Sequence, residues 1–210
     1  LQALFGGVVS GKKVWLVTGS SRGIGLAVAQ RALAAGDKVA LLARGPEIND
    51  LAGRLGEDCI ACQADVSQRE QVLAAISRTL AHWGRLDILV NNAGAHRGGK
   101  VDRLSLADWQ TVIDTNLTGA LNVISAASPH LQPGSSVVNI GAVVGFRGFP
   151  GDSAYAASKA GIAGLTRALA IEFAARGIGV NLVIPGLVLT EMTRALSEKA
   201  LESMRRKIPM

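Results

Sequence analysis

Short runs of consecutive apolar residues alternate along the chain with longer stretches in which apolar residues recur every three or four positions. The short runs are typical of strands buried on both faces of a parallel sheet, and the longer stretches are typical of the helices that cover such a sheet. The expected strands are Lys13–Thr18, Lys38–Ala43, Cys59–Gln63, Leu86–Val90, Ser136–Ile140 and Gly179–Ile184. The expected helices are Ile24–Ala35, Pro46–Leu55, Gln68–Trp83, Leu106–Ser128 and Ser153–Arg176.

This alternation predicts the α/β fold class, as a Rossmann-type doubly wound parallel sheet with helices on both faces. Residues 1–210 are expected to form a single dinucleotide-binding domain, because no linker-like change in composition and no internal repeat interrupts the pattern. Residues 187–208 follow the last expected strand and are expected to form a lid over the substrate. Sheets of this kind bind ligands beyond the carboxyl ends of their strands. We therefore expect the functional residues to follow the strands directly.

The net charge of +6 admits nucleic acid as a partner, but the charges are not arranged for that role. Residues 194–210 hold five basic and two acidic residues, so half of the excess lies at one end of the chain. This indicates either a solvated terminal helix or a basic collar for an anionic small molecule or an acidic carrier. No apolar run reaches the roughly 18 residues that span a bilayer. We expect neither nucleic acid nor membrane as a partner.

Cys59 and Cys62 form a C-x-x-C pair inside an expected strand. In thiol oxidoreductases this spacing opens a helix, whose N-terminus lowers a thiol pKa. A zinc site would need four ligands, and no second C-x-x-C is present. We therefore expect two buried strand cysteines and no metal site, with redox or metal chemistry as the alternative. Two cysteines cannot form the disulfide framework of a secreted domain, so we expect a cytoplasmic location.

A glycine-rich turn, Thr18-Gly-Ser-Ser-Arg-Gly-Ile-Gly25, joins the first strand to the first helix. Glycine allows the backbone to approach a phosphate closely, and the start of a helix offers free N–H groups and a positive dipole end to the anion. This position predicts dinucleotide binding. The expected contacts are Gly19, Ser21, Arg22, Gly23, Ile24 and Gly25.

The second expected strand is followed by Arg44, where NAD-binding proteins usually carry an acidic residue. Arg44 and Arg22 together offer two guanidinium groups for a 2′-phosphate. The pair therefore favours NADP(H) over NAD(H) as the cofactor. The alternative is that both are ordinary surface arginines.

The spacing T-G-x-x-x-G-x-G, the sequence Asn91-Asn-Ala-Gly94 and the motif Tyr155-x-x-x-Lys159 together resemble the short-chain dehydrogenase/reductase family over nearly the whole chain. Within that family, the contexts Val143–Gly145 and Ala156–Gly161 are most similar to bacterial 3-oxoacyl-[acyl-carrier-protein] reductases. The resemblance implies a homo-oligomer, either a dimer or a tetramer. It also implies that this chain lacks the last helix and strand of the family fold.

The resemblance implies further site residues. Asp65 and Val66 would contact the adenine, and Asn116 would anchor a proton-relay water. The remaining cofactor contacts would be Asn92, Ala93, Gly94, Pro185, Gly186, Val188 and Thr190.

Tyr155 is the only tyrosine in the chain, so it is the only phenol that can protonate a carbonyl oxygen as hydride arrives at the carbon. A free phenol has a pKa of about 10. Lys159 lies on the same helical face, and its ammonium is expected to stabilise the phenolate and lower that pKa. The resemblance adds that Lys159 also holds the nicotinamide ribose. The alternative is an ordinary amphipathic helix pair.

Ala142 departs from the family pattern, which places a serine thirteen residues before the tyrosine. An alanine methyl cannot donate a hydrogen bond to the substrate oxygen, and losing one such donor costs about a hundredfold to a thousandfold in rate. Either an engineered substitution or a natural loss of activity would explain an alanine at this position. Ser135 and Ser136 precede the expected strand and are too far back to substitute, and Ser153, on the approach to the tyrosine helix, is an alternative hydroxyl.

The expected function is NADPH-dependent reduction of a carbonyl to a secondary alcohol, impaired by Ala142, with a small ketone or a 3-oxoacyl thioester as substrate. Acyl carrier protein is a candidate partner: the resemblance implies a docking role for Arg176, and the terminal basic residues add positive charge. The alternative is that Arg176 caps the end of its helix. One alternative is a short-chain reductase for a steroid, sugar, polyol or quinone. Another is a non-catalytic NADP(H)-binding sensor. The expected substrate contacts are Ala142, Val144, Tyr155, Gly186, Leu187 and Met192.

Overall fold

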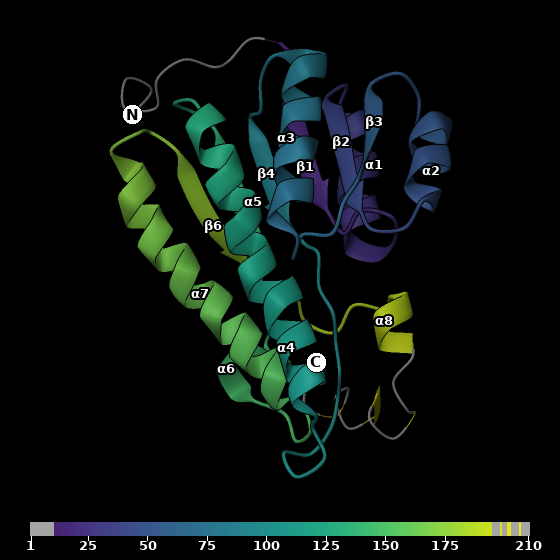
Figure 1. Ribbon diagram of the computed structural model, residues 1–210, viewed down its shortest axis with the longest axis vertical. Coiled ribbons are helices and arrows are strands. Elements are labelled where there is room, and N and C mark those ends of the chain that lie inside the picture. Colours follow the sequence, from purple (N-terminus) through teal and green to yellow (C-terminus); the bar gives the residue numbers. More distant parts are fainter. Residues whose placement is uncertain (1–10, 195–197, 199–200, 203–205, 207–210) are drawn as a thin grey trace.

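A six-stranded, wholly parallel sheet forms the centre of the computed structural model, which describes residues 11–194, 198, 201–202 and 206 (Figure 1). The strands lie in the order β3-β2-β1-β4-β5-β6, which confirms the doubly wound fold class. Their bounds are β1 Val14–Thr18, β2 Lys38–Ala43, β3 Cys59–Gln63, β4 Ile88–Asn91, β5 Ser136–Ile140 and β6 Gly179–Val183.

Helices connect the strands and cover both faces of the sheet. The α-helices are α1 Gly23–Ala34, α2 Glu47–Leu55, α3 Arg69–Trp83, α4 Leu106–Ile113, α5 Gly119–Ala127, α6 Val144–Arg147, α7 Ser153–Ala174 and α8 Glu191–Arg194. A π-helical turn, η1, covers Asp114–Thr118, and a 3₁₀ turn, η2, covers Ser128–His130.

The core consists of two apolar clusters, one on each face of the sheet. The larger cluster packs α3, α5 and α7 against the strands through residues such as Ile76, Ile124 and Phe173. Figure 1 shows these three helices on one face. The second cluster packs α1 and α2 against the other face through Ala29 and Ile48. Burial on both faces explains why the strands are continuous apolar runs.

The expected helix Leu106–Ser128 is interrupted by η1, so the prediction of one regular helix was wrong in detail. The wider turn inserts an extra residue and directs Asn116 into the interior, where it is 2% exposed. Gly119 follows directly, and a Cβ there would lie 2.6 Å from Cγ2 of Val66. Close packing of this helix against the loop after β3 therefore requires glycine. The short helix α6 was not expected, because a single turn leaves no periodic pattern.

The strand order reverses between β1 and β4, whose carboxyl ends diverge into loops on opposite sides of the sheet. Such a switch point is where doubly wound sheets bind their ligands. Of the expected lid at 187–208, the structure describes residues 187–194, 198, 201–202 and 206. Within the described residues, we find no helix long and apolar enough to cross a membrane.

Candidate active site

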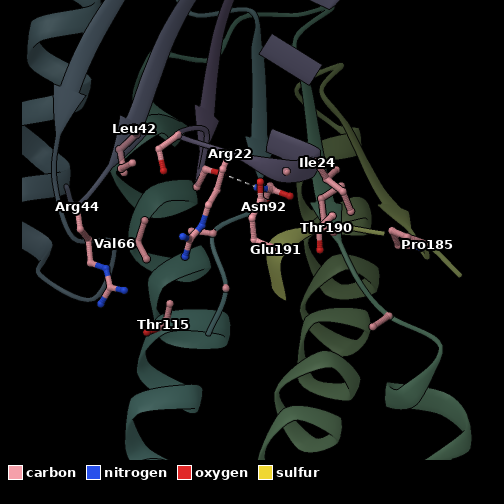
Figure 2. A pocket seen from close by; sticks show the side chains of 18 of the residues that line it. Arg22, Ile24, Leu42, Arg44, Val66, Asn92, Thr115, Pro185, Thr190 and Glu191 are labelled. Carbon is pink, nitrogen blue, oxygen red and sulfur yellow. Dashed lines mark hydrogen bonds between the residues drawn. The ribbon is translucent and has the colours of Figure 1, made fainter. Parts of the chain in front are cut away.

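A cleft of about 680 Å³ opens at the carboxyl ends of the strands, within the size range of small-molecule sites (Figure 2). Figure 2 shows Arg44 and Val66 on one side, Thr190 and Pro185 on the other, and Arg22 and Asn92 between them. Of the expected cofactor contacts, the following line it: Gly19, Ser21, Arg22, Gly23, Ile24, Arg44, Asp65, Val66, Asn92, Ala93, Gly94, Tyr155, Lys159, Pro185, Gly186, Val188 and Thr190.

The turn between β1 and α1 depends on its glycines. Gly19 and Gly23 have φ of 63° and 58°, a region that side-chain-bearing residues seldom adopt. A Cβ on Gly19 would also lie 2.7 Å from Cα of Ala93. Gly25 does not line the cleft. A Cβ there would collide with the carbonyl oxygen of Gly19 and the side chain of Asn92, so this glycine lets α1 pack beneath the turn.

The first turn of α1 has free donors. Arg22 occupies the N-cap position in an extended conformation, and its side chain makes no capping hydrogen bond. The first N–H groups of a helix have no partner within the helix. Combined with the helix dipole, they form a site suited to a phosphate group in the cleft.

Thr18 and Asn92 hold this turn against the end of β4. The Asn92 side chain donates through Nδ2 to the carbonyl oxygens of Thr18 and Gly19, both at 3.0 Å. The Thr18 hydroxyl oxygen accepts 3.0 Å hydrogen bonds from the backbone N–H groups of Asn92 and Ala93. The two middle residues of the Asn-Asn-Ala-Gly motif therefore shape the glycine turn.

The two arginines of the cleft have different surroundings. Arg44, with a side chain 66% exposed, forms a 3.8 Å ion pair with Asp65, which itself accepts hydrogen bonds from the backbone N–H and hydroxyl of Ser67. Arg22 has no described carboxylate partner, and Figure 2 shows its side chain extending into the cleft. Both guanidinium groups are available to an anion bound there.

The segment after β6 approaches the glycine turn. Thr193 donates from its hydroxyl to the carbonyl oxygen of Val188 at 2.8 Å and accepts from the backbone N–H of Thr190 at the same distance. These bonds fold the segment back on itself. A Cβ on Gly23 would lie 3.6 Å from the Thr190 methyl, so the two loops enclose one end of the cleft.

Tyr155 and Lys159 enter the cleft from the first turns of α7. Lys159 is 4% exposed, and its Nζ donates a 2.7 Å hydrogen bond to the carbonyl oxygen of Ile140. Nζ lies 5.6 Å from the centre of the Tyr155 ring. Burial lowers the pKa of Lys159 to about 8.

The net shift of the Tyr155 pKa is opposite to the one expected from Lys159. Burial raises the pKa of the phenol, and the Asp152 carboxylate raises it further. The ammonium is directed at the backbone of β5, and its own burial disfavours its charged form. Desolvation therefore outweighs the attraction between ammonium and phenolate.

The side chain of Asn116 is fully engaged in bonds within the protein. Its Oδ1 accepts from the backbone N–H of Ala95 at 2.7 Å, and its Nδ2 donates at 3.0 Å to the Ala95 carbonyl oxygen and to the Ser158 hydroxyl. The Ser158 hydroxyl in turn donates to the carbonyl oxygen of Tyr155 at 2.8 Å. Asn116 therefore ties the loop after β4 to α7. Its expected contact with a relay water stays a prediction.

Ala142 lines the cleft just beyond the end of β5, together with Tyr155 and Lys159. The alternative hydroxyl does not replace it, since Ser153 is exposed at the start of α7 and does not line the cleft. Among the expected substrate contacts, Gly186 also lines the cleft, whereas Val144 and Leu187 do not. The side chain of Met192 lies outside the described residues.

Several cleft or neighbouring residues were missed by sequence reasoning. Thr115, in the π-helical turn, lines the cleft, and so do Glu47 and Glu191 at the starts of α2 and α8. Asp152 was not singled out at all. It forms a 2.9 Å hydrogen bond with His96, beside Tyr155. Asp152 and His96 are 56 residues apart, so no local pattern could have paired them.

Arg176 and the cysteines have structural surroundings. The Arg176 guanidinium donates to the carbonyl oxygens of Ser128 and Leu131 at 2.6 and 3.1 Å, so it stabilises the end of η2 rather than standing free for a carrier. Cys59 and Cys62 are buried in β3, and burial raises the pKa of Cys59 to about 11. A thiol with a raised pKa is a poor nucleophile near neutrality.

A doubly wound sheet, a glycine turn at its switch point and a Tyr-x-x-x-Lys helix facing the same cleft define a dinucleotide-type oxidoreductase architecture. Comparison with known families specifies the class. The family model for short chain dehydrogenase matches residues 13–201, and the chain belongs to this family.

Individual relatives agree with this assignment. The chain is 40% identical over 203 residues to a 3-oxoacyl-[acyl-carrier-protein] reductase of Staphylococcus aureus, covering 93% of this chain and 82% of the relative. It is 41% identical over 201 residues to the Homo sapiens protein of the same name, covering 94% and 84%. A short chain dehydrogenase from Burkholderia cenocepacia in complex with NADP superposes with a TM-score of 0.87 at 38% identity, covering 92% of this chain and 82% of that one.

Proposed function

We propose that this protein reduces a carbonyl group to a secondary alcohol with NADPH, and that the substrate is a 3-oxoacyl thioester. The observation that carries the proposal is that Tyr155 and Lys159 line the same cleft as the glycine turn and the two arginines. The names of the Staphylococcus aureus and human relatives support the substrate class, and the NADP in the Burkholderia cenocepacia structure supports the cofactor.

The residues of the cleft fit a dinucleotide with a 2′-phosphate. The start of α1, which has no side-chain cap, suits the phosphates. Gly19 has no side chain, so the turn can lie close to the end of β4. Arg22 and Arg44 would hold the 2′-phosphate, and the loop through Gly186 and Thr190 would hold the nicotinamide end. When bound, NADPH supplies a hydride to the carbonyl carbon.

Tyr155 donates the proton in this proposal, from its hydroxyl to the carbonyl oxygen of the substrate. Burial raises its pKa, so the phenol holds its proton at neutral pH and donates it only as negative charge develops on the substrate oxygen. Lys159 lies near the Tyr155 ring, and its ammonium group favours the phenolate that remains after the proton has been transferred. Asn116 and Ser158 fix the backbone at Tyr155 and so orient the phenol.

Ala142 weakens this site. A serine there would donate a hydrogen bond to the oxygen on which negative charge develops, and a methyl group cannot. Removing one such donor from an enzyme site costs about a hundredfold to a thousandfold in rate. We therefore propose that the protein as written is a slow reductase with an intact cofactor site.

The deciding experiment is a reductase assay with acetoacetyl-coenzyme A, using NADPH and NADH, on the protein and on Ala142→Ser. We expect Ala142→Ser to raise kcat by about a hundredfold or more with NADPH, while the Kd for NADPH stays the same. Ala157→Ser, on an exposed position of α7, is the matched control and should leave kcat unchanged. An Ala142→Ser protein that turns over no faster would refute the role given to this position.

Two other functions keep specific support. The same residues would serve a reductase for a steroid, sugar, polyol or quinone, which a panel of such ketones would reveal. A non-catalytic NADP(H) sensor is favoured by Ala142 itself. NADPH binding without turnover of any ketone, in both the protein and Ala142→Ser, would support the sensor.

The proposal includes the assembly and the location. A cytoplasmic homo-oligomer, dimer or tetramer, fits the large apolar side chains that α4 and α7 leave exposed, among them Leu106 at 85% and Ile171 at 80%. Light scattering coupled to gel filtration measures the assembly directly. Acyl carrier protein stays a proposed partner, to be tested by comparing acyl-carrier and coenzyme A thioesters.

A further inference from the structure

The loop between β2 and α2 brings a carboxylate to the cleft as well as a guanidinium group. Arg44, Gly45 and Glu47 all line the cleft, and Glu47 is the first residue of α2. Arg44 forms a 3.8 Å ion pair with Asp65. Among the described residues, the exposed Glu47 side chain has neither an ion-pair partner nor a hydrogen-bond partner, so its charge is available to a ligand in the cleft.

The carboxyl group of Glu47 is folded back over Gly45. A Cβ on Gly45 would overlap both carboxyl oxygens of Glu47, which are the nearest atoms to that position. The group therefore lies over the turn that leaves β2 rather than extending outward along α2. In NAD-binding proteins of this architecture, an acidic residue near the end of this strand accepts hydrogen bonds from the ribose hydroxyls. Here Ala43 and Arg44 hold the strand end, and Glu47 supplies the carboxylate.

We propose that Glu47 is a specificity-determining residue for the coenzyme: its carboxylate accepts a hydrogen bond from the 2′-hydroxyl of NADH and repels the 2′-phosphate of NADPH, so that the protein binds both coenzymes. The inference rests on the proposed function, in which Arg22 and Arg44 hold the 2′-phosphate. Arg44 and Glu47 act in opposite directions, because a guanidinium group favours the phosphate and a carboxylate favours the hydroxyl.

An acidic residue at this position also has a purely structural explanation. A carboxylate in the first turn of a helix stabilises the helix through its dipole. Asp50 lies in the same first turn of α2, is exposed, and does not line the cleft. The dipole accounts for both acidic residues, but only Glu47 is directed toward the coenzyme site. Asp50 is therefore the matched control for removal of the charge.

Isothermal titration calorimetry with NADPH and with NADH, on the full chain, tests the proposal. The two coenzymes differ only in the 2′-phosphate, so the ratio of the Kd for NADH to the Kd for NADPH isolates the effect on that group. Glu47→Gln should raise this ratio by about tenfold, because NADH loses a charged acceptor and NADPH is no longer repelled. Asp50→Asn removes the same charge from the same helical turn and should leave the ratio unchanged.

Gly45→Ala tests the folded-back position of the carboxylate without changing any charge. Gly45 is not among the glycines with a positive φ, so its backbone accepts an alanine, and the atoms in the way belong to the end of a flexible side chain. The new methyl group should displace the carboxyl group and raise the ratio, as Glu47→Gln does. The double variant Gly45→Ala/Glu47→Gln should match Glu47→Gln alone, because the methyl group acts through the carboxylate.

The proposal is overturned if Glu47→Gln changes the ratio no more than Asp50→Asn does. It is also overturned if Gly45→Ala leaves the ratio unchanged while Glu47→Gln raises it, since the position of the carboxylate would then have no influence. These measurements use no ketone. A protein that turns over with NADPH but shows either result loses this inference alone, whereas a protein that binds neither coenzyme loses the proposed function as well.

Discussion

The Lys159 ammonium group donates a 2.7 Å hydrogen bond to the carbonyl oxygen of Ile140, the last residue of β5. This bond anchors the start of α7 to the sheet at the carboxyl end of a strand. The lysine is 4% exposed, and no described carboxylate forms an ion pair with it. Its charge is thus stabilised by one neutral acceptor, and burial lowers its pKa to about 8.

The buried lysine should make stability depend on pH. The ammonium proton of Lys159 has a pKa near 10.4 in the unfolded chain and about 8 in the folded protein. Between these pH values the unfolded chain binds more protons, so the contribution of Lys159 to the free energy of unfolding rises with pH. Across the whole window the gain is on the order of 3 kcal/mol. Urea denaturation of the protein and of Lys159→Met, at intervals from pH 7 to 10, measures it.

The difference between the two proteins is the relevant quantity, because burial also raises the pKa of Cys59 and Tyr155 and so destabilises both proteins at alkaline pH. We expect the free energy of unfolding of Lys159→Met to fall relative to that of the unaltered protein as pH rises. A difference in free energy that stays constant from pH 7 to 10 would contradict the lowered pKa of Lys159.

Gly25 should be indispensable for the glycine turn although it does not line the cleft. An alanine there would collide with the carbonyl oxygen of Gly19 and the side chain of Asn92, and would push α1 away from the turn. We expect Gly25→Ala to weaken NADPH binding by at least about tenfold, which corresponds to about 1.4 kcal/mol. Isothermal titration calorimetry with NADPH measures the Kd.

Gly53 provides the matched control for that substitution. It is exposed in α2, and a Cβ there would meet nothing within 4 Å. Gly53→Ala should leave the Kd unchanged and stabilise the protein by roughly 0.5–1 kcal/mol, because alanine favours helix. Equal Kd values for Gly25→Ala and Gly53→Ala would show that the turn tolerates a side chain.

Arg44 should contribute to coenzyme choice. Hydrogen bonds to charged groups contribute about 1.5–3 kcal/mol, so Arg44→Gln should weaken NADPH binding by roughly tenfold to a hundredfold and leave NADH binding nearly unchanged. Arg54→Gln, at an exposed position in the last turn of α2, is the control. Equal losses for both coenzymes would argue that Arg44 supports the loop through Asp65 rather than reading the 2′-phosphate.

Asn116 should be among the most sensitive buried residues. Asn116→Ala would remove three hydrogen bonds, so the backbone groups of Ala95 would lose their side-chain partner and the Ser158 hydroxyl would lose the donor that it accepts from. We expect a loss of about 2–4 kcal/mol in the free energy of unfolding. Thermal and urea denaturation provide the measurement. Asn49→Ala, which removes one exposed hydrogen bond to Pro46, should cost less than about 1 kcal/mol.

The alternating pattern was sufficient for the fold, because strands buried on two faces and helices buried on one leave different periods in the sequence. All six strands were located, with ends displaced by at most two residues. The glycine turn and the Tyr-x-x-x-Lys spacing were visible because both are local. The π-helical turn at Asn116 was not, since one inserted residue changes the period of a helix too little to detect.

Contacts between distant segments account for the rest of what was missed. The Asp152 carboxylate, which raises the pKa of Tyr155, bonds to His96, and these two residues lie far apart in the sequence. Burial likewise governs Lys159, whose effect on the phenol was expected from helical spacing alone. The net shift of the Tyr155 pKa is set mainly by desolvation, which depends on how the chain packs around α7 and cannot be read from the sequence.

All six strands run in one direction, so the cleft takes its loops from a single edge of the sheet, and the turns that enter the strands lie at the other. Those entry turns include Gly36, Gly84 and Gly134, each with a positive φ. A fluorophore or a surface tether placed beside these turns would be separated from the coenzyme by the full length of the strands. The protein can therefore be immobilised in a chosen orientation, with its ligand entrance facing the solution.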